Sequence, residues 1–266
     1  MVNINKIFDL TDKVIVLTGS SGLLGEQYAE GLCQCGATLA LADKNFQKTK
    51  EIAKRLESKY NCQLFPIKLD LTNKKSIVNS VSKIFKKFGK IDVLINNAMY
   101  HEGENEQNAS FENFPLSSWE KVISVNITGM FLMCQEIGKI MKKQKSGVII
   151  NISSIYGMVG ADQRIYGKSN INSTAAYATT KSAILNFSRY LASYFHKDGI
   201  RVNTLSLGGV SNNQDSAFRK NYSKRTMIGR MAKKDEYVGG IIFLASDASS
   251  YMTGSNLIID GGWTAW

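Results

Sequence analysis

Short apolar runs alternate along this chain with longer segments of helical periodicity, and this alternation restricts the possible folds most strongly. The apolar runs cover residues 14–17, 37–42, 63–68, 91–95, 147–152, 200–206 and 256–259, and the helical segments cover 23–35, 46–60, 73–88, 116–142, 174–197 and 235–246. Strands that are apolar throughout are typical of a parallel sheet with helices on both faces. The alternation therefore predicts an α/β fold, a Rossmann-like doubly wound parallel sheet of about seven strands.

A single domain is expected to span residues 1–266. The chain contains only two prolines, and no Ser-, Gly- or Pro-rich linker or internal repeat interrupts it. The N-terminus leads into no long apolar run, and no apolar stretch reaches the roughly 20 residues of a membrane span. The four cysteines and two histidines lack metal-ligand spacing. We therefore expect a cytoplasmic protein with free thiols and no metal site.

The chain is basic, with 33 Lys and Arg against 22 Asp and Glu and a net charge of +11. Such a charge can indicate a polyanionic partner. The lysines, however, are scattered along helical segments such as 73–90, and no interleaved aromatic and basic motif occurs. We therefore expect neither a nucleic-acid partner nor a membrane partner, while an anionic small substrate remains open.

A glycine-rich turn lies between the first strand and the first helix, at residues 18–25 with the sequence TGSSGLLG. Its glycines permit a tight turn, close approach of a pyrophosphate to backbone amides, and close helix–strand packing. Asp43 ends the second strand, where a carboxylate can accept hydrogen bonds from the adenosine ribose. The sequence therefore predicts a dinucleotide site that favours NAD over NADP, a preference that Lys44 could soften.

A tyrosine and a lysine, Tyr177 and Lys181, are four residues apart and share one face of the predicted helix 174–197. A nearby positive charge lowers the pKa of a phenol, which ordinarily lies near ~10. The pair could therefore donate and accept a proton. On its own, such spacing more often reflects a lysine lying along a half-buried tyrosine.

The whole chain resembles the short-chain dehydrogenase/reductase family, in its compact single-domain branch. Eight motifs occur in that family's order: the glycine turn 18–25, LDL at 69–71, NNA at 96–98, VNITG at 125–129, NISS at 151–154, YATTK at 177–181, RVN at 201–203 and DGG at 260–262. The resemblance implies hydride transfer between a nicotinamide cofactor and a hydroxyl or keto carbon.

The resemblance also implies residue roles. Tyr177 would be the general acid/base, Lys181 would lower its pKa and bind the nicotinamide ribose, Ser154 rather than Ser153 would hold the substrate oxygen, and Asn126 would anchor a water. Cofactor contacts are implied at Gly19, Ser21, Gly22, Leu24, Gly25, Asp43, Asp70, Leu71, Asn97, Ala98, Tyr177, Lys181, Gly208 and Val210. The cofactor would be NAD, or NADP, and the protein would form a tetramer or dimer through the helices 116–142 and 174–197.

Three positions depart from the family pattern. The glycines are spaced G-x-x-G-x-x-G, which is commoner in the extended branch, Met99 replaces a glycine, and Leu207 replaces a proline. The chain ends soon after residue 262, which leaves no room for the extended branch's additional substrate region. We therefore expect the compact fold, with altered detail in the cofactor loops.

Two segments, 155–176 and 208–230, are expected to border the substrate. The first separates Ser154 from Tyr177 by more residues than is usual, and its polar and aromatic side chains (Asp162, Arg164, Tyr166, Lys168, Asn170) suggest a polyhydroxylated or charged substrate. The second is basic, and arginines suit phosphate or carboxylate. Substrate contacts are therefore expected at Ser154, Arg164, Tyr166, Arg219 and Arg225. The alternatives are a surface elaboration or subunit contact for the first segment and a solvated helix face for the second.

The acidic segment 101–114 is expected to be an exposed rim. The residues 155–172, 208–214 and 260–266 are similar to a bacterial group in flagellin-modification and nonulosonic (legionaminic) acid pathways. That resemblance implies a sugar phosphate or nucleotide-linked sugar as substrate, in surface-glycan biosynthesis. The alternatives are a 3-oxoacyl-thioester (acyl-carrier-protein) reductase and a non-enzymatic cofactor-binding sensor or scaffold.

Overall fold

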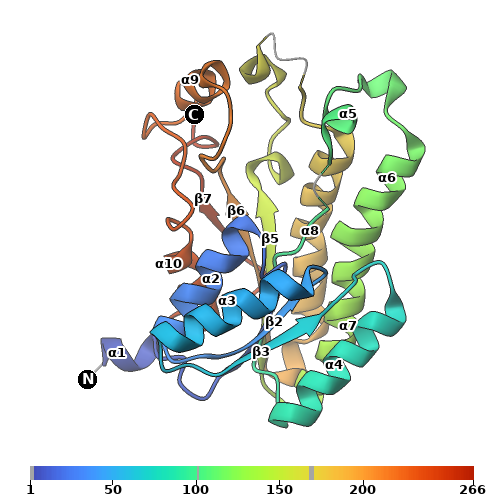
Figure 1. The fold of residues 1–266 in the computed structure, drawn as a ribbon. Coiled ribbons are helices and arrows are strands. Elements are labelled where there is room, and N and C mark those ends of the chain that lie inside the picture. The colour runs from blue at the N-terminus through green and yellow to red at the C-terminus, as the bar shows by residue number, and fades with distance from the viewer. Residues whose placement is uncertain (1–2, 101, 168–170) are drawn as a thin grey trace.

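The computed structural model describes residues 3–100, 102–167 and 171–266, and these residues contain a seven-stranded parallel sheet in the order β3-β2-β1-β4-β5-β6-β7 (Figure 1). The strands are β1 (Val14–Thr18), β2 (Thr38–Asp43), β3 (Leu64–Lys68), β4 (Val93–Asn96), β5 (Gly147–Ser154), β6 (Ile200–Leu207) and β7 (Asn256–Ile259). The predicted doubly wound sheet is confirmed, and strand ends differ from the prediction by at most two residues.

Helices cover both faces of the sheet (Figure 1). They are α1 (Ile4–Ile7), α2 (Leu23–Gln34), α3 (Phe46–Lys59), α4 (Lys74–Phe88), α5 (Glu104–Gln107), α6 (Leu116–Ile123), α7 (Met130–Gln144), α8 (Ala175–Tyr194), α9 (Ser216–Ser223) and α10 (Val238–Ala245). Ile15 and Leu17 pack with α2, α3 and α10, whereas Val16 between them packs with α4, α7 and α8. Successive side chains of a strand point to opposite faces, so two covered faces explain strands that are apolar at every position.

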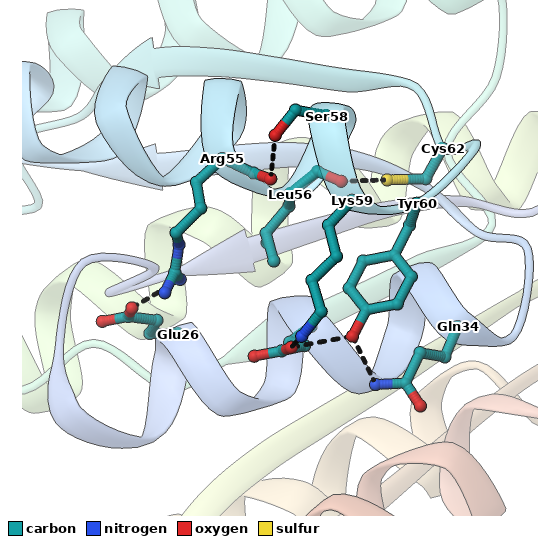
Figure 2. A network of polar contacts seen from close by, with 9 residues as sticks. Glu26, Gln34, Arg55, Leu56, Ser58, Lys59, Tyr60 and Cys62 are labelled. Carbon is teal, nitrogen blue, oxygen red and sulfur yellow. Dashed lines mark hydrogen bonds and ion pairs between the residues drawn. The ribbon is translucent and has the colours of Figure 1, made fainter.

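Two ion pairs join α2 to α3 beside the sheet (Figure 2). Arg55 Nη2 lies 2.5 Å from Glu26 Oε1, and Lys59 Nζ lies 2.7 Å from Glu30 Oε1, which also accepts a hydrogen bond from the Tyr60 hydroxyl at 2.8 Å. Because both basic side chains are more than half exposed, each pair stabilises the fold by at most about 1 kcal/mol. The buried side of α2, with Tyr28, Ala29 and Leu32, is what orients this helix after the glycine-rich turn.

The predicted helix 116–142 is divided in the structure. A π-helical segment, Ser124–Gly129, separates α6 from α7 and contains Asn126. Such wide turns are rare and occur frequently at functional sites. The apolar spacing is helical on both sides of the segment, so the periodicity predicted one continuous helix.

A third apolar cluster lies beyond the carboxyl ends of the strands. Most of its members come from the segments 155–176 and 208–230 or directly follow them, and one lies near the C-terminal end. They are Ile155, Tyr156, Ile165, Tyr222, Met231 and Trp263. The rings of Tyr166 and Phe218 join the two segments with their centroids 5.2 Å apart. Figure 1 shows the segment after β5 and helix α9 at the same end of the molecule, far from α1.

Within the described part of the chain, no helix combines the length and apolarity needed to cross a membrane. The same residues bring no three metal-binding side chains (His, Cys, Asp or Glu) together.

Candidate active site

A cavity of about 550 Å³ opens at the carboxyl ends of β1, β2 and β4, and we call it the glycine-turn cavity. It lies where the chain reverses the order in which strands are added, between β1 and β4. Ligands of open α/β sheets bind at such a switch point. Its walls include the following predicted cofactor residues: Gly19, Ser21, Gly22, Leu24, Gly25, Asp43, Asp70, Leu71, Asn97, Ala98 and Val210.

The glycine turn itself leaves no room for side chains at two positions. A Cβ on Gly25 would lie 2.1 Å from the carbonyl oxygen of Gly19, and one on Gly19, whose φ is +67°, would lie 2.7 Å from Cα of Ala98. The turn therefore exposes bare backbone at the start of α2. Such a surface fits the pyrophosphate of a dinucleotide.

Thr18 and Asn97 hold the glycine turn in place. The Thr18 hydroxyl accepts hydrogen bonds from the backbone N–H groups of Asn97 and Ala98 at 3.0 and 3.1 Å. The Asn97 side-chain amide donates to the carbonyl oxygens of Thr18 and Gly19, each at 3.1 Å. Sequence reasoning gave Thr18 no role, although its place at the end of the first strand was a usable signal.

Two carboxylates line the glycine-turn cavity in fixed orientations. Asp43 accepts hydrogen bonds from the backbone N–H groups of Ser21 at 3.0 Å and Asn45 at 2.9 Å. Asp70 accepts from the hydroxyl and N–H of Thr72 at 2.7 and 2.9 Å, and these bonds hold its pKa below the ordinary value. Lys44 lines the same cavity beside Asp43. Asp43 is thus placed to meet a ribose, with a cation next to it.

A second cavity of about 390 Å³, which we call the tyrosine cavity, opens at the carboxyl ends of β5 and β6. Leu24, Asn97, Met99 and Val210 line both cavities, so the two adjoin. The predicted residues on its wall are Leu24, Asn97, Ser154, Tyr166, Tyr177, Lys181, Gly208 and Val210. The structure therefore brings three of the four predicted catalytic residues to one wall beside the glycine turn.

The tyrosine–lysine pair lies on the first turns of α8, with Lys181 buried and Tyr177 half-buried. Lys181 Nζ donates a hydrogen bond to the carbonyl of Ile152 at 3.0 Å and lies 5.7 Å from the ring centroid of Tyr177. Burial lowers the pKa of Lys181 to about 8. Burial also raises the pKa of Tyr177, against the nearby Ser154 hydroxyl, which lowers it, while the nearby charge of Glu102 raises it further. The expected net lowering of the Tyr177 pKa by Lys181 is therefore wrong for this structure, because loss of water around the phenol dominates.

The two neighbouring serines at the end of β5 differ in their partners. Ser153 donates its hydroxyl hydrogen bond to the carbonyl of Lys181 at 2.7 Å, which ties β5 to α8. Ser154 lies on the wall of the tyrosine cavity near enough to the Tyr177 phenol to lower its pKa. Both serines line the cavity, but of the two only Ser154 acts on the pKa of Tyr177, which agrees with the preference for Ser154.

Asn126 is buried and lines neither cavity. Its side-chain oxygen accepts a hydrogen bond from the backbone N–H of Tyr100 at 2.8 Å, and its amide donates to the Thr180 hydroxyl at 3.3 Å. The π-helical segment therefore links the connection after β4 to the residue that precedes Lys181.

The structure does not bring the three predicted arginines into the tyrosine cavity. The side chain of Arg164 is 82% exposed and pairs with Asp162 at 2.8 Å. Arg225 also contacts Asp162, at 3.2 Å, and lies over the ring of Trp263. Arg219 is exposed and lines neither cavity. The predicted clamp for an anionic group is therefore not formed, because an acidic neighbour binds two of its members.

Tyr166 does line the tyrosine cavity, whereas Lys168 and Asn170 lie outside the described residues. Another wall residue, Tyr156, has a buried hydroxyl that makes no hydrogen bond of good geometry with any described residue, although the Tyr166 hydroxyl lies near it.

The acidic segment 101–114 is only partly the exposed rim that was predicted. Glu102 is buried at 9% exposure, lines the tyrosine cavity, and accepts a hydrogen bond from the Thr174 hydroxyl at 2.7 Å. Sequence reasoning missed it. No local signal distinguishes it from the other acids of the segment, since its burial depends on a residue 72 positions away.

The geometry agrees with comparisons to known proteins. A family model described as enoyl-(acyl carrier protein) reductase matches residues 20–264. The chain is 30% identical over 257 residues to the post-translational flagellin modification protein A of Campylobacter coli, covering 96% of this chain and 99% of that one. The chain belongs to the short-chain dehydrogenase/reductase family. It is thus an NAD(P)-dependent oxidoreductase of CH–OH and C=O groups.

Two solved short-chain dehydrogenases show similar folds. A gluconate 5-dehydrogenase from Burkholderia cenocepacia, in complex with NADP and tartrate, is 27% identical with a TM-score of 0.88, covering 99% of this chain and 100% of that one. A short-chain dehydrogenase from Leptospira borgpetersenii with bound NAD+ is 34% identical with a TM-score of 0.85, covering 99% and 96%. These two relatives contain different dinucleotides, so the likeness alone does not choose between NAD and NADP.

Proposed function

We propose that this short-chain dehydrogenase transfers a hydride between a nicotinamide dinucleotide and a hydroxyl or keto carbon of a sugar or polyol. The observation that carries the proposal is the convergence of Ser154, Tyr177 and Lys181 on one wall of a cavity that adjoins the glycine turn. The cavity wall also carries hydroxyl and amide side chains of Gln107, Asn172, Ser173 and Gln214, which suit a substrate with several hydroxyls.

Each catalytic side chain has a chemical task in this proposal. The bound nicotinamide would supply or accept the hydride. Ser154 would hydrogen-bond the substrate oxygen, and Tyr177 would give a proton to it or take one from it. Since its pKa is raised, Tyr177 carries its proton at neutral pH and is ready to donate in the direction of reduction. In the direction of oxidation the phenol must lose that proton, which the charge of Lys181 favours.

NAD is the cofactor we propose. The Asp43 carboxylate lines the glycine-turn cavity and is held by two backbone N–H groups. It would accept hydrogen bonds from ribose hydroxyls and repel a 2′-phosphate. Lys44, on the same wall, would reduce that discrimination without reversing it.

The biological role we propose is surface-glycan biosynthesis. The likeness to the flagellin modification protein of Campylobacter coli supports this role, and the relative that acts on gluconate supports a polyhydroxylated substrate. Arg164, Arg219 and Arg225 lie outside the tyrosine cavity, so the structure offers no support for the phosphate group expected from the sequence.

A 3-oxoacyl-thioester reductase is the second candidate, because a 3-oxoacyl-(acyl-carrier-protein) reductase from Aquifex aeolicus is 29% identical to this chain over 257 residues. A panel of polyols, ketoses, nucleotide-linked sugars and acetoacetyl thioesters, assayed with NAD(H) and NADP(H), separates the two. We expect turnover of a hydroxylated compound that is lost in both Tyr177→Phe and Ser154→Ala. Turnover of the thioester alone would show that the sugar proposal is wrong.

We also propose that the protein associates with itself through α7 and α8. A groove of about 380 Å³ between these helices is lined by aromatic side chains, of which Phe131, Tyr190 and Tyr194 are 44%, 61% and 56% exposed. Exposed aromatic patches of this kind mark protein interfaces. Sedimentation analysis should show an oligomer that Tyr190→Glu dissociates; a wild-type monomer would contradict the assignment.

A further inference from the structure

The helix that carries Tyr177 begins after a threonine whose hydroxyl is held on two sides. We propose that Thr174 is a positioning residue, which places the Tyr177 phenol beside Ser154 for proton transfer by holding the backbone of Tyr177. The inference rests on the proposed function, because it takes Tyr177 to be the group that transfers the proton.

Thr174 is the N-cap residue of α8, and its hydroxyl has two partners. It accepts a hydrogen bond from the backbone N–H of Tyr177 at 3.1 Å and donates one to the Glu102 carboxylate at 2.7 Å. Because the hydroxyl hydrogen is given to Glu102, a lone pair of the oxygen stays directed at the N–H of Tyr177. Thr174 is only 3% exposed, so water has little access to either bond. The cap therefore fixes the first turn of α8, in which Tyr177 lies.

The stretch in front of the cap is anchored to two other parts of the chain. Asn172 donates its backbone N–H to the carbonyl of Gln107 at 2.9 Å. The backbone of Ser173 exchanges two hydrogen bonds with the Gln163 side chain, at 2.9 and 3.1 Å. Thr174 directly follows this fixed stretch, so its cap transmits the position of the stretch to the first turn of α8.

The carbonyl of Tyr177 is held as well. It accepts a hydrogen bond from the Thr180 hydroxyl at 2.9 Å, and that hydroxyl accepts one from the Asn126 amide at 3.3 Å. Asn126 in turn accepts a backbone hydrogen bond from the connection after β4 at 2.8 Å. The same connection carries the carboxylate that holds Thr174. Since this connection borders both cavities, it places Tyr177 relative to a dinucleotide in the glycine-turn cavity.

Loss of the cap should act on the chemical step. The N–H of Tyr177 is one of the first four of its helix, so it has no partner within the helix once the cap is removed. Only the carbonyl side, held by Thr180, would then stay in place. A misplacement of about 1 Å can lower the rate of an enzyme about a hundredfold. Thr174 does not line the glycine-turn cavity, so binding of the dinucleotide should not change.

The experiment removes the two hydrogen bonds of Thr174 without changing the shape of the cavity wall. Thr174→Val has nearly the shape of threonine but lacks the hydroxyl, whereas Thr174→Ser keeps it. Thr174→Gly is a second variant without the hydroxyl, because glycine is tolerated at N-caps with little loss of stability. The control is Asn73→Ala. Asn73 caps α4 by accepting from the N–H of Ser76 at 3.1 Å, so the control removes a cap of the same kind from another helix.

The probes are D-sorbitol with NAD, D-fructose with NADH and acetoacetyl-CoA with NADH. For each probe, kcat, KM and the solvent deuterium isotope effect on kcat are measured in wild type and in every variant. The dissociation constant of NAD is measured by fluorescence titration, and the melting temperature is measured for each protein.

We expect Thr174→Val and Thr174→Gly to lower kcat about tenfold or more, with a smaller change in KM and an NAD dissociation constant within about twofold of wild type. Their solvent isotope effect should rise, because proton transfer becomes slower relative to the other steps. Thr174→Ser should keep kcat within about threefold. Thr174→Val and Asn73→Ala should both lower the melting temperature by about 2–4 °C, but Asn73→Ala should leave kcat and the isotope effect unchanged.

The inference is overturned if kcat in Thr174→Val and Thr174→Gly equals that of wild type, if Thr174→Ser loses as much as Thr174→Val, or if Asn73→Ala lowers kcat to the same extent. In each of these cases, turnover that is lost in Tyr177→Phe would leave the proposed function intact. Turnover that Tyr177→Phe does not change, or no turnover of any probe, would remove the proposed function and the role of Thr174 with it.

Discussion

The two adjoining cavities of this protein are built in different ways. The glycine-turn cavity is formed at strand ends, where backbone groups and short side chains are locked by hydrogen bonds such as those of Thr18 with Asn97 and Ala98. The tyrosine cavity is enclosed by long connections whose aromatic rings pack on each other, as Tyr166 does on Phe218. A cavity made of backbone tolerates little variation, whereas one made of side chains can be altered without disturbing the sheet.

Tyr177→Phe tests whether the chemistry resides in the tyrosine cavity alone. Loss of the phenolic proton donor should lower kcat by about 10²–10⁴-fold. The dissociation constant for the dinucleotide should stay within about threefold, because the glycine-turn cavity keeps all its hydrogen bonds. Stopped-flow turnover and fluorescence titration measure the two quantities. An equal loss of kcat and of dinucleotide affinity would mean that the two cavities do not act separately.

Gly25→Ala tests the opposite side of the comparison. Its Cβ would lie 2.1 Å from the Gly19 carbonyl oxygen, so the turn must move, and we expect dinucleotide binding to weaken about a hundredfold, with a loss of about 2 kcal/mol in the free energy of unfolding. Gly160→Ala, in the connection after β5, is the control, since a Cβ there meets nothing within 4 Å. Urea denaturation measures the free energy of unfolding, and titration measures dinucleotide binding. Comparable effects of Gly25→Ala and Gly160→Ala would contradict the expected difference between the two cavities.

The buried Lys181 should make the stability of the protein depend on pH. Burial lowers its pKa in the folded protein to about 8, so the folded protein releases this proton before the unfolded chain does. Below pH 8 the buried ammonium lowers the free energy of unfolding by its full amount. As the pH rises from 8 towards the pKa of a lysine in the unfolded chain, the folded protein loses this charge and the free energy of unfolding increases. Lys181→Met should increase the free energy of unfolding by about 1–2 kcal/mol at about pH 7, and less at about pH 9. A constant difference between the variants across this range would exclude the titration as its cause.

Asp43→Asn should have the smallest effect. Removing the negative charge should weaken NAD binding about tenfold and leave NADP binding unchanged or improved. The change concerns only the ribose end of the glycine-turn cavity, so the relative rates on different substrates should not change. Titration with both dinucleotides measures the preference. Equal weakening of the two would show that Asp43 acts through the conformation of the turn, by way of its hydrogen bond to Ser21.

The same contrast explains how far the sequence predicts this protein. The strand positions and the glycine-turn cavity follow from local patterns, because an apolar strand, a glycine turn and an acid at the next strand end are each fixed by near neighbours. Glu102 could not be identified, since its burial depends on Thr174, and the arginines were misplaced because Asp162 pairs with two of them. Sequence reveals which residue types are present, but the partner of a long side chain is decided by tertiary structure.

The wide turn at Ser124–Gly129 has a geometric consequence of its own. A π-helical turn closes i→i+5 hydrogen bonds, whereas an α-helical turn closes i→i+4 bonds, so the segment accommodates one residue more than a regular helix would. Deleting one residue there would leave a regular α-helix in which Met133 and Ile137 of α7 stay buried against the sheet. The wide turn thus serves the placement of Asn126, and a single-residue deletion would disturb the contacts of Asn126 with Tyr100 and Thr180 before it damaged the core.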